Sequence, residues 1–425
     1  MHGEIIKVSR NTENAPINDG STQSVAFSHY NNISAQLPID PESQKLVEGG
    51  IKEQTKQCLS NIRSIVDSIE HSLNDVVKIT IYLKSMTDLD AVDEVYKQYF
   101  ISHLPTRTVI AVAALPLEGA LVQIDALISN GEGTHPQEPC ELIKLVRNTA
   151  KAPTSLLSSQ SVAFSHYNHI SAQLPIEPET GNIAEGGIKA QTRQCLKNIK
   201  SILNSIDVPF DDIVKLNIHL RSLDDAFAVN QVYSTFFPDS AIARSVAYVP
   251  ARTIIKADGL PMDALVQIDA TVSHGDGTPP QAVEDRHGIV IRAHNTEAAP
   301  ISKFSTQTVA FSHYNNVSAQ LPIHPSSGEV IANDVGEQTM QCLDNIKAII
   351  KSVHHIMDDI VKLNIQLKDI NDLQVVEDIL ASYFDKELPA CTVIGVSEIF
   401  MDASIQIDAI VSNGEGTFPK EELSY

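Results

Sequence analysis

The side chains best suited to bind a metal or to act as nucleophiles recur three times along the chain. Each of three AFSHYN segments holds a histidine, and each of three QTxQCLxNI segments holds a cysteine. These residues are His29, His166 and His313, followed by Cys58, Cys195 and Cys342. No two cysteines have CxxC spacing, and none of these three histidines has a ligand partner at i+2 or i+4. We therefore expect solvated or hydrogen-bonded turn histidines and core cysteines, with no metal site.

The recurring residues belong to three copies of a longer segment. SVAFSHYNNISAQLPI starts at Ser24, a close copy starts at Ser161 and a third at Thr308, at intervals of 137 and 147 residues. Such intervals indicate copies of a whole domain, because solenoid repeats are much shorter. We place the linkers in the Gly, Pro and acid-rich stretches Asn130–Cys140 and His274–His287. The predicted domains are residues 1–137, 138–284 and 285–425.

Within the first copy, the hydrophobic periodicity alternates between helix and strand. Apolar residues fall on one helical face from Ile51 to Ile69 and again from Thr87 to Phe100. The predicted strands are Ile5–Val8, Val25–His29, Asn32–Gln36, Val77–Leu83, Thr108–Ala114 and Ala120–Ser129. The resulting order is roughly ββαβαββ, with the opening strands paired, and it predicts an α+β domain with both helices on one face of a mixed sheet.

The last predicted strand is apolar on both faces. Val122 and Ile124 alternate with Leu121 and Leu127 on the opposite side. A sheet whose first face is covered by helices then needs another sheet against its second face, as when three copies close around an axis. Tethering would favour this assembly within one chain.

The composition excludes several classes of function. The 425 residues include 31 basic and 53 acidic side chains, for a net charge of −22, and no run of Lys or Arg. We expect no nucleic-acid partner, because phosphate contacts supply most of that affinity. Anionic membranes are disfavoured for the same reason. No apolar stretch is long enough to span a bilayer, and Met1–Arg10 lacks a signal-peptide core, so we expect a cytoplasmic protein.

Five short motifs resemble the Rid family of reactive-intermediate deaminases, also called the YjgF or L-PSP endoribonuclease family. They are ENAP from Glu13, SAQLP from Ser34, GGIKEQTKQCLSNI from Gly49, LPTRT from Leu104 and VQIDA from Val122, and the strand segment DVVKITIYLK from Asp75 adds to the resemblance. The resemblance covers nearly all of each copy. It implies chorismate-mutase-like ββαβαββ domains that form trimers with a ligand cleft between adjacent subunits. Three tandem copies would then form an intramolecular pseudo-trimer, and the chain would be a monomer that acts as an internal trimer.

The resemblance implies hydrolysis of 2-imino or 2-enamino acids, such as 2-aminoacrylate, to a 2-keto acid and ammonia without a cofactor. The arginine that it assigns to catalysis is Arg107 in LPTRT and Arg252 in VPART, whereas Cys391 replaces it in LPACT. Arginine suits a small anionic imino or keto acid because its planar fork binds carboxylate in two places. An arginine at a strand start is otherwise an ordinary surface residue. The third site is thus expected to be degenerate, with Cys391 as a lost anchor rather than a new nucleophile.

Other positions carried over from the family are expected to contact the substrate. The serine of the family motif is Ser34, Ser171 and Ser318. A family glutamate on the final strand is replaced by Gln123, Gln267 and Gln406, and glutamine can orient water but cannot accept its proton. A family asparagine on the second helix is Asn230 in copy two, but Asp93 and Glu377 in the others. Copy two therefore keeps the most family-like set.

These residues leave three hypotheses open. The first is a hydrolytic deaminase with at most two arginine-containing sites. The second is a keto-acid binding or regulatory protein of the same fold, which the glutamines and the lost third arginine favour. The third is an endoribonuclease, which the net charge of −22 disfavours. The glycine-rich phosphate loop, GxSxG and HExxH motifs are absent, so the sequence predicts no cofactor.

Overall fold

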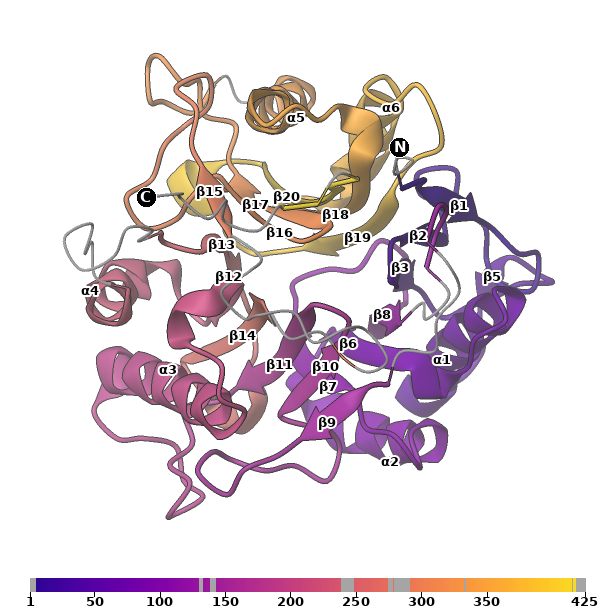
Figure 1. Cartoon of the computed structure of the whole chain (residues 1–425). Helices are drawn as coiled ribbons and strands as arrows, with labels where there is room; N and C mark the ends of the chain where they lie inside the picture. The colour runs from indigo at the N-terminus through magenta and orange to yellow at the C-terminus, as the bar shows by residue number, and fades with distance from the viewer. Residues whose placement is uncertain are drawn as a thin grey trace.

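Each repeat folds into one six-stranded sheet with two long helices on its outer face (Figure 1). The computed structural model describes residues 5–129, 133–137, 143–237, 248–273, 278, 291–331, 334–414 and 416–417. The predicted linkers fall mostly outside these residues. No helix in the described part of the chain combines the length and apolarity needed to cross a bilayer.

Apart from a short hairpin in domain 1, the three domains have the same element order. Domain 1 contains β1 (Val8–Arg10), β2 (Ser24–Phe27), β3 (Tyr30–Gln36), the hairpin β4 (Ile39–Asp40) and β5 (Lys45–Leu46), α1 (Ile51–Ser68), β6 (Val76–Leu83), α2 (Leu89–Tyr99), β7 (Thr106–Ala111) and β8 (Val122–Ser129). Domain 2 contains β9 (Leu145–Arg147), β10 (Ser161–Phe164), β11 (Tyr167–Gln173), α3 (Gly187–Ser205), β12 (Ile213–Leu220), α4 (Ala226–Phe236), β13 (Ala251–Lys256) and β14 (Val266–Ser273). Domain 3 contains β15 (Arg292–His294), β16 (Thr308–Phe311), β17 (Tyr314–Gln320), α5 (Val335–Ser352), β18 (Ile360–Leu367), α6 (Leu373–Ala381), β19 (Ala390–Gly395) and β20 (Ile405–Ser412).

The α+β class and the ββαβαββ order are confirmed, and the short opening strand forms one edge of each sheet. The strand order in domain 1 is β1-β2-β3-β8-β6-β7, and only the β6–β7 pair is parallel. The other two sheets repeat this order. The parallel pair is joined by the crossover helix α2, which places the start of β7 beside that helix.

The largest errors in the predicted boundaries, of three residues, lie at two strands, whereas the other boundaries differ by two residues or fewer. The opening strand begins at Val8 rather than Ile5, because Ile5 is buried in an inter-domain cluster and the N–H of Ile6 bonds to His135 O. The strand predicted over Thr108–Ala114 instead covers Thr106–Ala111, where it pairs with β6 up to Leu83. Pairing with a partner strand, rather than residue type, decided this second boundary.

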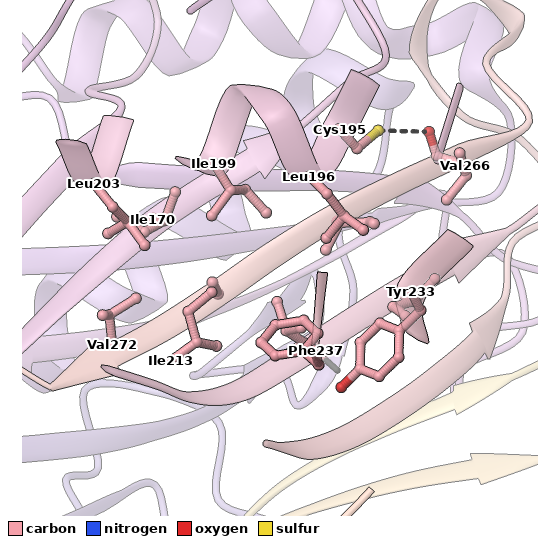
Figure 2. Packing of buried hydrophobic residues seen from close by; sticks show 14 of the residues in the cluster. Ile170, Cys195, Leu196, Ile199, Leu203, Ile213, Tyr233, Phe237, Val266 and Val272 are labelled. Atoms are coloured by element: carbon pink, nitrogen blue, oxygen red, sulfur yellow. Dashed lines mark hydrogen bonds between the residues drawn. The ribbon is translucent and has the colours of Figure 1, made fainter. Parts of the chain in front are cut away.

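The helices cover the sheets as the periodicity predicts. In domain 2, Leu196, Ile199 and Leu203 of α3 point onto the sheet toward Ile213 and Val272 (Figure 2). The recurring cysteines lie in the same layer, with Cys195 Sγ 3.8 Å from Val266 O. Burial raises the pKa of this thiol well above its usual value. The cysteines are therefore core residues, as predicted. The recurring histidines lie in the tight turns after β2, β10 and β16, where His29 and His166 are buried.

The inner faces of the sheets meet around a common axis (Figure 1). Three tyrosines form a ring there, each donating its hydroxyl hydrogen to a carbonyl of the next domain. The pairs are Tyr30 to Phe164 O, Tyr167 to Phe311 O and Tyr314 to Phe27 O. The same pairs make edge-to-face ring contacts with centroids 5.5–5.7 Å apart. Identical contacts between successive domains place the three sheets in threefold pseudo-symmetry.

A cavity of about 160 Å³ lies on the axis. Its wall alternates a lysine of one domain with an aspartate of the next. The Nζ to Oδ distances are 2.6 Å for Lys78 and Asp269, 3.5 Å for Lys215 and Asp408, and 3.7 Å for Lys362 and Asp125. At these distances the buried lysines and aspartates form inter-domain ion pairs. The three positive and three negative charges balance. The aspartates of the final strands therefore form ion pairs with lysines of other domains at the axis.

We expect Tyr167→Phe to destabilise the whole assembly. The substitution removes the donor to Phe311 O and leaves a buried carbonyl without this partner, which costs about 1–3 kcal/mol. Urea denaturation would measure the loss in free energy of unfolding. Tyr383→Phe is the matched control, since its hydroxyl bonds at the exposed surface and its removal should cost under about 0.5 kcal/mol. Equal losses in the two variants would contradict the role of the ring.

His169 should make the protein less stable in mild acid. It lies beside the axial cavity where the other repeats have Asn32 and Asn316, and burial lowers its pKa to about 3. An unfolded histidine has a pKa near ~6.5, so the unfolded state binds the extra proton as the pH falls from 6.5 toward 3. We expect the free energy of unfolding to decrease by about 2 kcal/mol between pH 6.5 and 5 because of this residue. Urea titrations at both values should show a smaller decrease in His169→Asn, and an unchanged decrease would refute the assignment.

Candidate active site at the domain interfaces

The strand that starts with the arginine motif lies against β3 or its counterpart in the next domain. Backbone N–H groups at the arginine position donate to the predicted serines across each interface. The first interface joins Arg107 N to Ser171 Oγ at 2.9 Å, the second Arg252 N to Ser318 Oγ at 2.9 Å, and the third Cys391 N to Ser34 Oγ at 2.8 Å. The structure thus brings the predicted arginine and serine positions together, always from two different domains.

Each serine hydroxyl has a defined direction. It donates to a carbonyl twelve residues earlier, Thr22 O for Ser34, Ser159 O for Ser171 and Thr306 O for Ser318. The oxygen also accepts the N–H from the neighbouring domain. A hydroxyl has one donor hydrogen and two lone pairs, so one acceptor position remains. The serines therefore hold the interface together, and their expected contact with substrate stays a prediction.

The second interface presents a guanidinium with a neutral partner. Arg252 Nη1 donates to Asn230 Oδ1 at 2.7 Å, and Arg252 Cζ lies 4.9 Å from the centroid of Tyr233. Phe304 of domain 3 lies on the same guanidinium, 5.6 Å from ring centroid to Cζ. Burial lowers the pKa of Arg252, but the side chain stays partly exposed and cationic. This arrangement can bind a planar carboxylate beside two aromatic rings.

The first interface has the same architecture with a charged partner. Arg107 Nη2 forms an ion pair with Asp93 Oδ1 at 2.5 Å, and Arg107 Cζ lies 4.5 Å from the centroid of Tyr96. Only 7% of the arginine side chain and 17% of the aspartate side chain are exposed. The charge of Arg107 is therefore already neutralised inside the protein.

The third interface has no guanidinium, as the sequence predicts. Cys391 is buried, and desolvation raises the pKa of its thiol to about 12, against the opposing influence of Lys362. Glu377 replaces Asn230 and fills the space beside Gly20, where a Cβ atom would overlap its carboxylate. Burial also raises the pKa of Glu377. A protonated thiol is a poor nucleophile, which agrees with Cys391 as a lost anchor.

One sequence family covers all three of these interfaces. The family described as endoribonuclease L-PSP matches residues 12–129, 149–274 and 295–413. The chain belongs to this family. The resemblance to Rid and YjgF proteins is thereby confirmed for every copy.

Members of the L-PSP family resemble single copies of this chain. A RutC family protein of Pyrococcus horikoshii is 42% identical over 117 residues, which are 27% of this chain and 92% of that protein. The 2-iminobutanoate/2-iminopropanoate deaminase of Mus musculus is 40% identical over 128 residues, 30% of this chain and 94% of the mouse protein. A crystal structure of RidA from Psychrobacter is 35% identical and covers 29% of this chain and 98% of its own, with a TM-score of 0.28.

The three glutamines at the family glutamate position are buried on the inner sheet faces. Gln406 Nε2 donates to Ile254 O at 3.0 Å across the second interface and to Gln366 Oε1 at 2.5 Å. A glutamate could make neither donation. Gln406 is thus placed near the strand of Arg252, but its amide is engaged with protein acceptors. Gln123 and Gln267 occupy the matching positions in β8 and β14.

The sequence reasoning missed the aromatic residues that flank the arginines. Tyr96 follows Asp93 by three residues, and Tyr233 follows Asn230 by the same interval, so each pair shares one helix face. The third copy has Leu380 at this position, beside the interface without an arginine. This covariation within one chain could have identified the tyrosines. Phe304 had no such signal, because its counterparts are Gly20 and Leu157.

Cys391 should be unreactive in the folded protein. Because its thiol is buried and its pKa is raised to about 12, almost no thiolate exists at pH 8. We expect iodoacetamide at pH 8 to label Cys391 at least 100-fold more slowly in the native protein than in urea, because the raised pKa alone lowers the thiolate fraction by about 10³ relative to a free thiol. Peptide mass spectrometry would measure both rates. Native labelling at the rate of the unfolded chain would instead identify a reactive nucleophile.

Proposed function

We propose that this chain hydrolyses 2-imino and 2-enamino acids, such as 2-aminoacrylate, to 2-keto acids and ammonia without a cofactor. The observation that carries the proposal is the guanidinium of Arg252, held by neutral Asn230 between Tyr233 and Phe304. Family membership and relatives named 2-iminobutanoate/2-iminopropanoate deaminase support the reaction class. The proposed catalytic residue is Arg252, whereas Arg107, which the resemblance also assigns to catalysis, is paired with Asp93 at the first interface.

The proposed reaction begins with the substrate carboxylate on the arginine. A guanidinium keeps its charge at all relevant pH values and pairs with carboxylate through two parallel N–H groups. An enamine first tautomerises to its imine, and water then adds to the C2 carbon of the C=N bond. The resulting tetrahedral carbon releases ammonia as the C–N bond breaks and the C=O bond forms. Arg252 would orient the substrate and stabilise negative charge near C2 throughout these steps.

Proton transfer in this scheme falls to water. Gln406 can orient a water molecule but cannot take its proton, and general-base assistance is commonly worth about 10²–10⁴ in rate. Activity should therefore be slower than in a site with a glutamate at this position. The same observation favours the alternative function, which is reversible binding of a keto acid without turnover. The hydrogen bonds from the Gln406 amide to Ile254 O and Gln366 also favour binding without turnover, because they use the amide hydrogens that could hold a water molecule.

A coupled assay separates the two functions. A PLP-dependent dehydratase would generate 2-aminoacrylate, and keto-acid release would be followed against semicarbazide trapping with and without this protein. We expect faster release, and we expect Arg252→Ala to remove at least 90% of the acceleration because the carboxylate anchor is lost. Arg63→Ala is a control, since its guanidinium lies over Tyr99 away from the interfaces. Binding of 2-oxobutyrate without acceleration would refute the deaminase and support the alternative.

We also propose that one chain is the working unit. The apolar inner faces of all three sheets already cover one another, and the N-terminal Lys7 reaches domain 3, bonding to Asp358 O and Ile360 O. Light scattering should therefore give a mass near 46.3 kDa. A particle of three chains would show that domains of different molecules pair instead.

A further inference from the structure

We propose that the residue facing the arginine from the second helix decides which interface accepts an anion, so that a chain with two arginines binds one carboxylate. This inference rests on the proposed function and assigns specificity within it. Asp93, Asn230 and Glu377 are the three residues concerned, at equivalent positions of α2, α4 and α6. They are positioning residues that act through the arginine.

Asp93 makes the first interface a closed ion pair. Its carboxylate contacts Nη2 of Arg107, and both side chains are mostly buried. A ligand carboxylate would have to displace Asp93 and leave a buried anion without its partner, which is strongly unfavourable in a low-dielectric site. If Asp93 stayed in place, two carboxylates would share one guanidinium and repel each other. Either arrangement weakens the binding of an anion to Arg107.

At the second interface, the neutral Asn230 holds Arg252 without neutralising its charge. Its amide oxygen accepts one of the five guanidinium hydrogens of Arg252 and contributes no charge. Among the residues that the structure describes, no carboxylate forms an ion pair with Arg252. The guanidinium is held in a fixed orientation and keeps an unbalanced positive charge. It is therefore preorganised for a ligand carboxylate, which would complete the pair.

Glu377 closes the third interface in a different way. Its side chain packs against Gly20 of domain 1, and the facing residue is the neutral thiol Cys391. No cation from the arginine position remains there to attract an anion. Among the described residues, the three interfaces therefore differ in charge: the first has an arginine paired with an acid, the second an arginine held by an amide, and the third an acid without the arginine.

The experiment is equilibrium dialysis of the full chain with radiolabelled 2-oxobutyrate, a keto acid that the enzyme cannot hydrolyse further. We expect one molecule bound per wild-type chain at saturation. Asp93→Asn should raise the number to two, because it converts the first interface to the charge pattern of the second. Asn230→Asp should weaken binding on the order of 100-fold, as expected for a lost charge-assisted contact.

The control variants separate a charge effect from misfolding. Arg107→Ala should leave one site, Arg252→Ala should leave none, and the double variant Asp93→Asn with Asn230→Asp should again bind one molecule, now at the first interface. Two equal sites in the wild type, or one site in Asp93→Asn with unchanged thermal unfolding, would overturn this inference and leave the proposed function standing. No binding to the wild type, together with no acceleration in the coupled assay, would overturn both.

Discussion

The closure of three sheet faces around one axis is the constraint on which the rest of the structure depends. Each tyrosine of the axial ring donates a hydrogen bond to the backbone carbonyl of a phenylalanine in the next domain. Its ring also packs edge-to-face on the ring of that phenylalanine. Apolar burial drives this closure, but hydrogen bonds that are buried and directional determine its register. The lysine and aspartate pairs of the cavity repeat the same cyclic order, from domain 1 to 2, 2 to 3 and 3 to 1.

This register creates the candidate sites. The strand with the arginine position meets the next domain only because the sheets are rotated about the axis, and the N–H of that position then reaches the serine hydroxyl. Site and assembly therefore share their contacts: Ser318 both joins two domains and lies at the strand start of Arg252. A change that loosened the axis would also move the two halves of every site.

Fusion of the repeats removes a restriction that applies to homotrimers, in which every site must be identical. Here the axial residues His169 and His219 occur in domain 2 alone, where the other repeats have Asn, Tyr or Gln. The three interfaces have diverged in the same way, through Asp93, Asn230 and Glu377. The core, by contrast, keeps the same pattern in all copies, because each helix must cover an equivalent sheet.

The sequence by itself determined the three domains, the ββαβαββ order, the buried cysteines and the loss of the third arginine. These features follow from repeat intervals, from local periodicity and from the identity of single residues. Only the tertiary structure decided which domains share each interface, that Asp93 neutralises Arg107, and that Phe304 lies on Arg252. The reason is physical: an ion pair or a ring contact depends on distances between strands and helices that are far apart in the chain, and sequence spacing carries no such distance. The aspartates of the final strands show the same limit, since only the packing of three sheets pairs them with lysines of another domain.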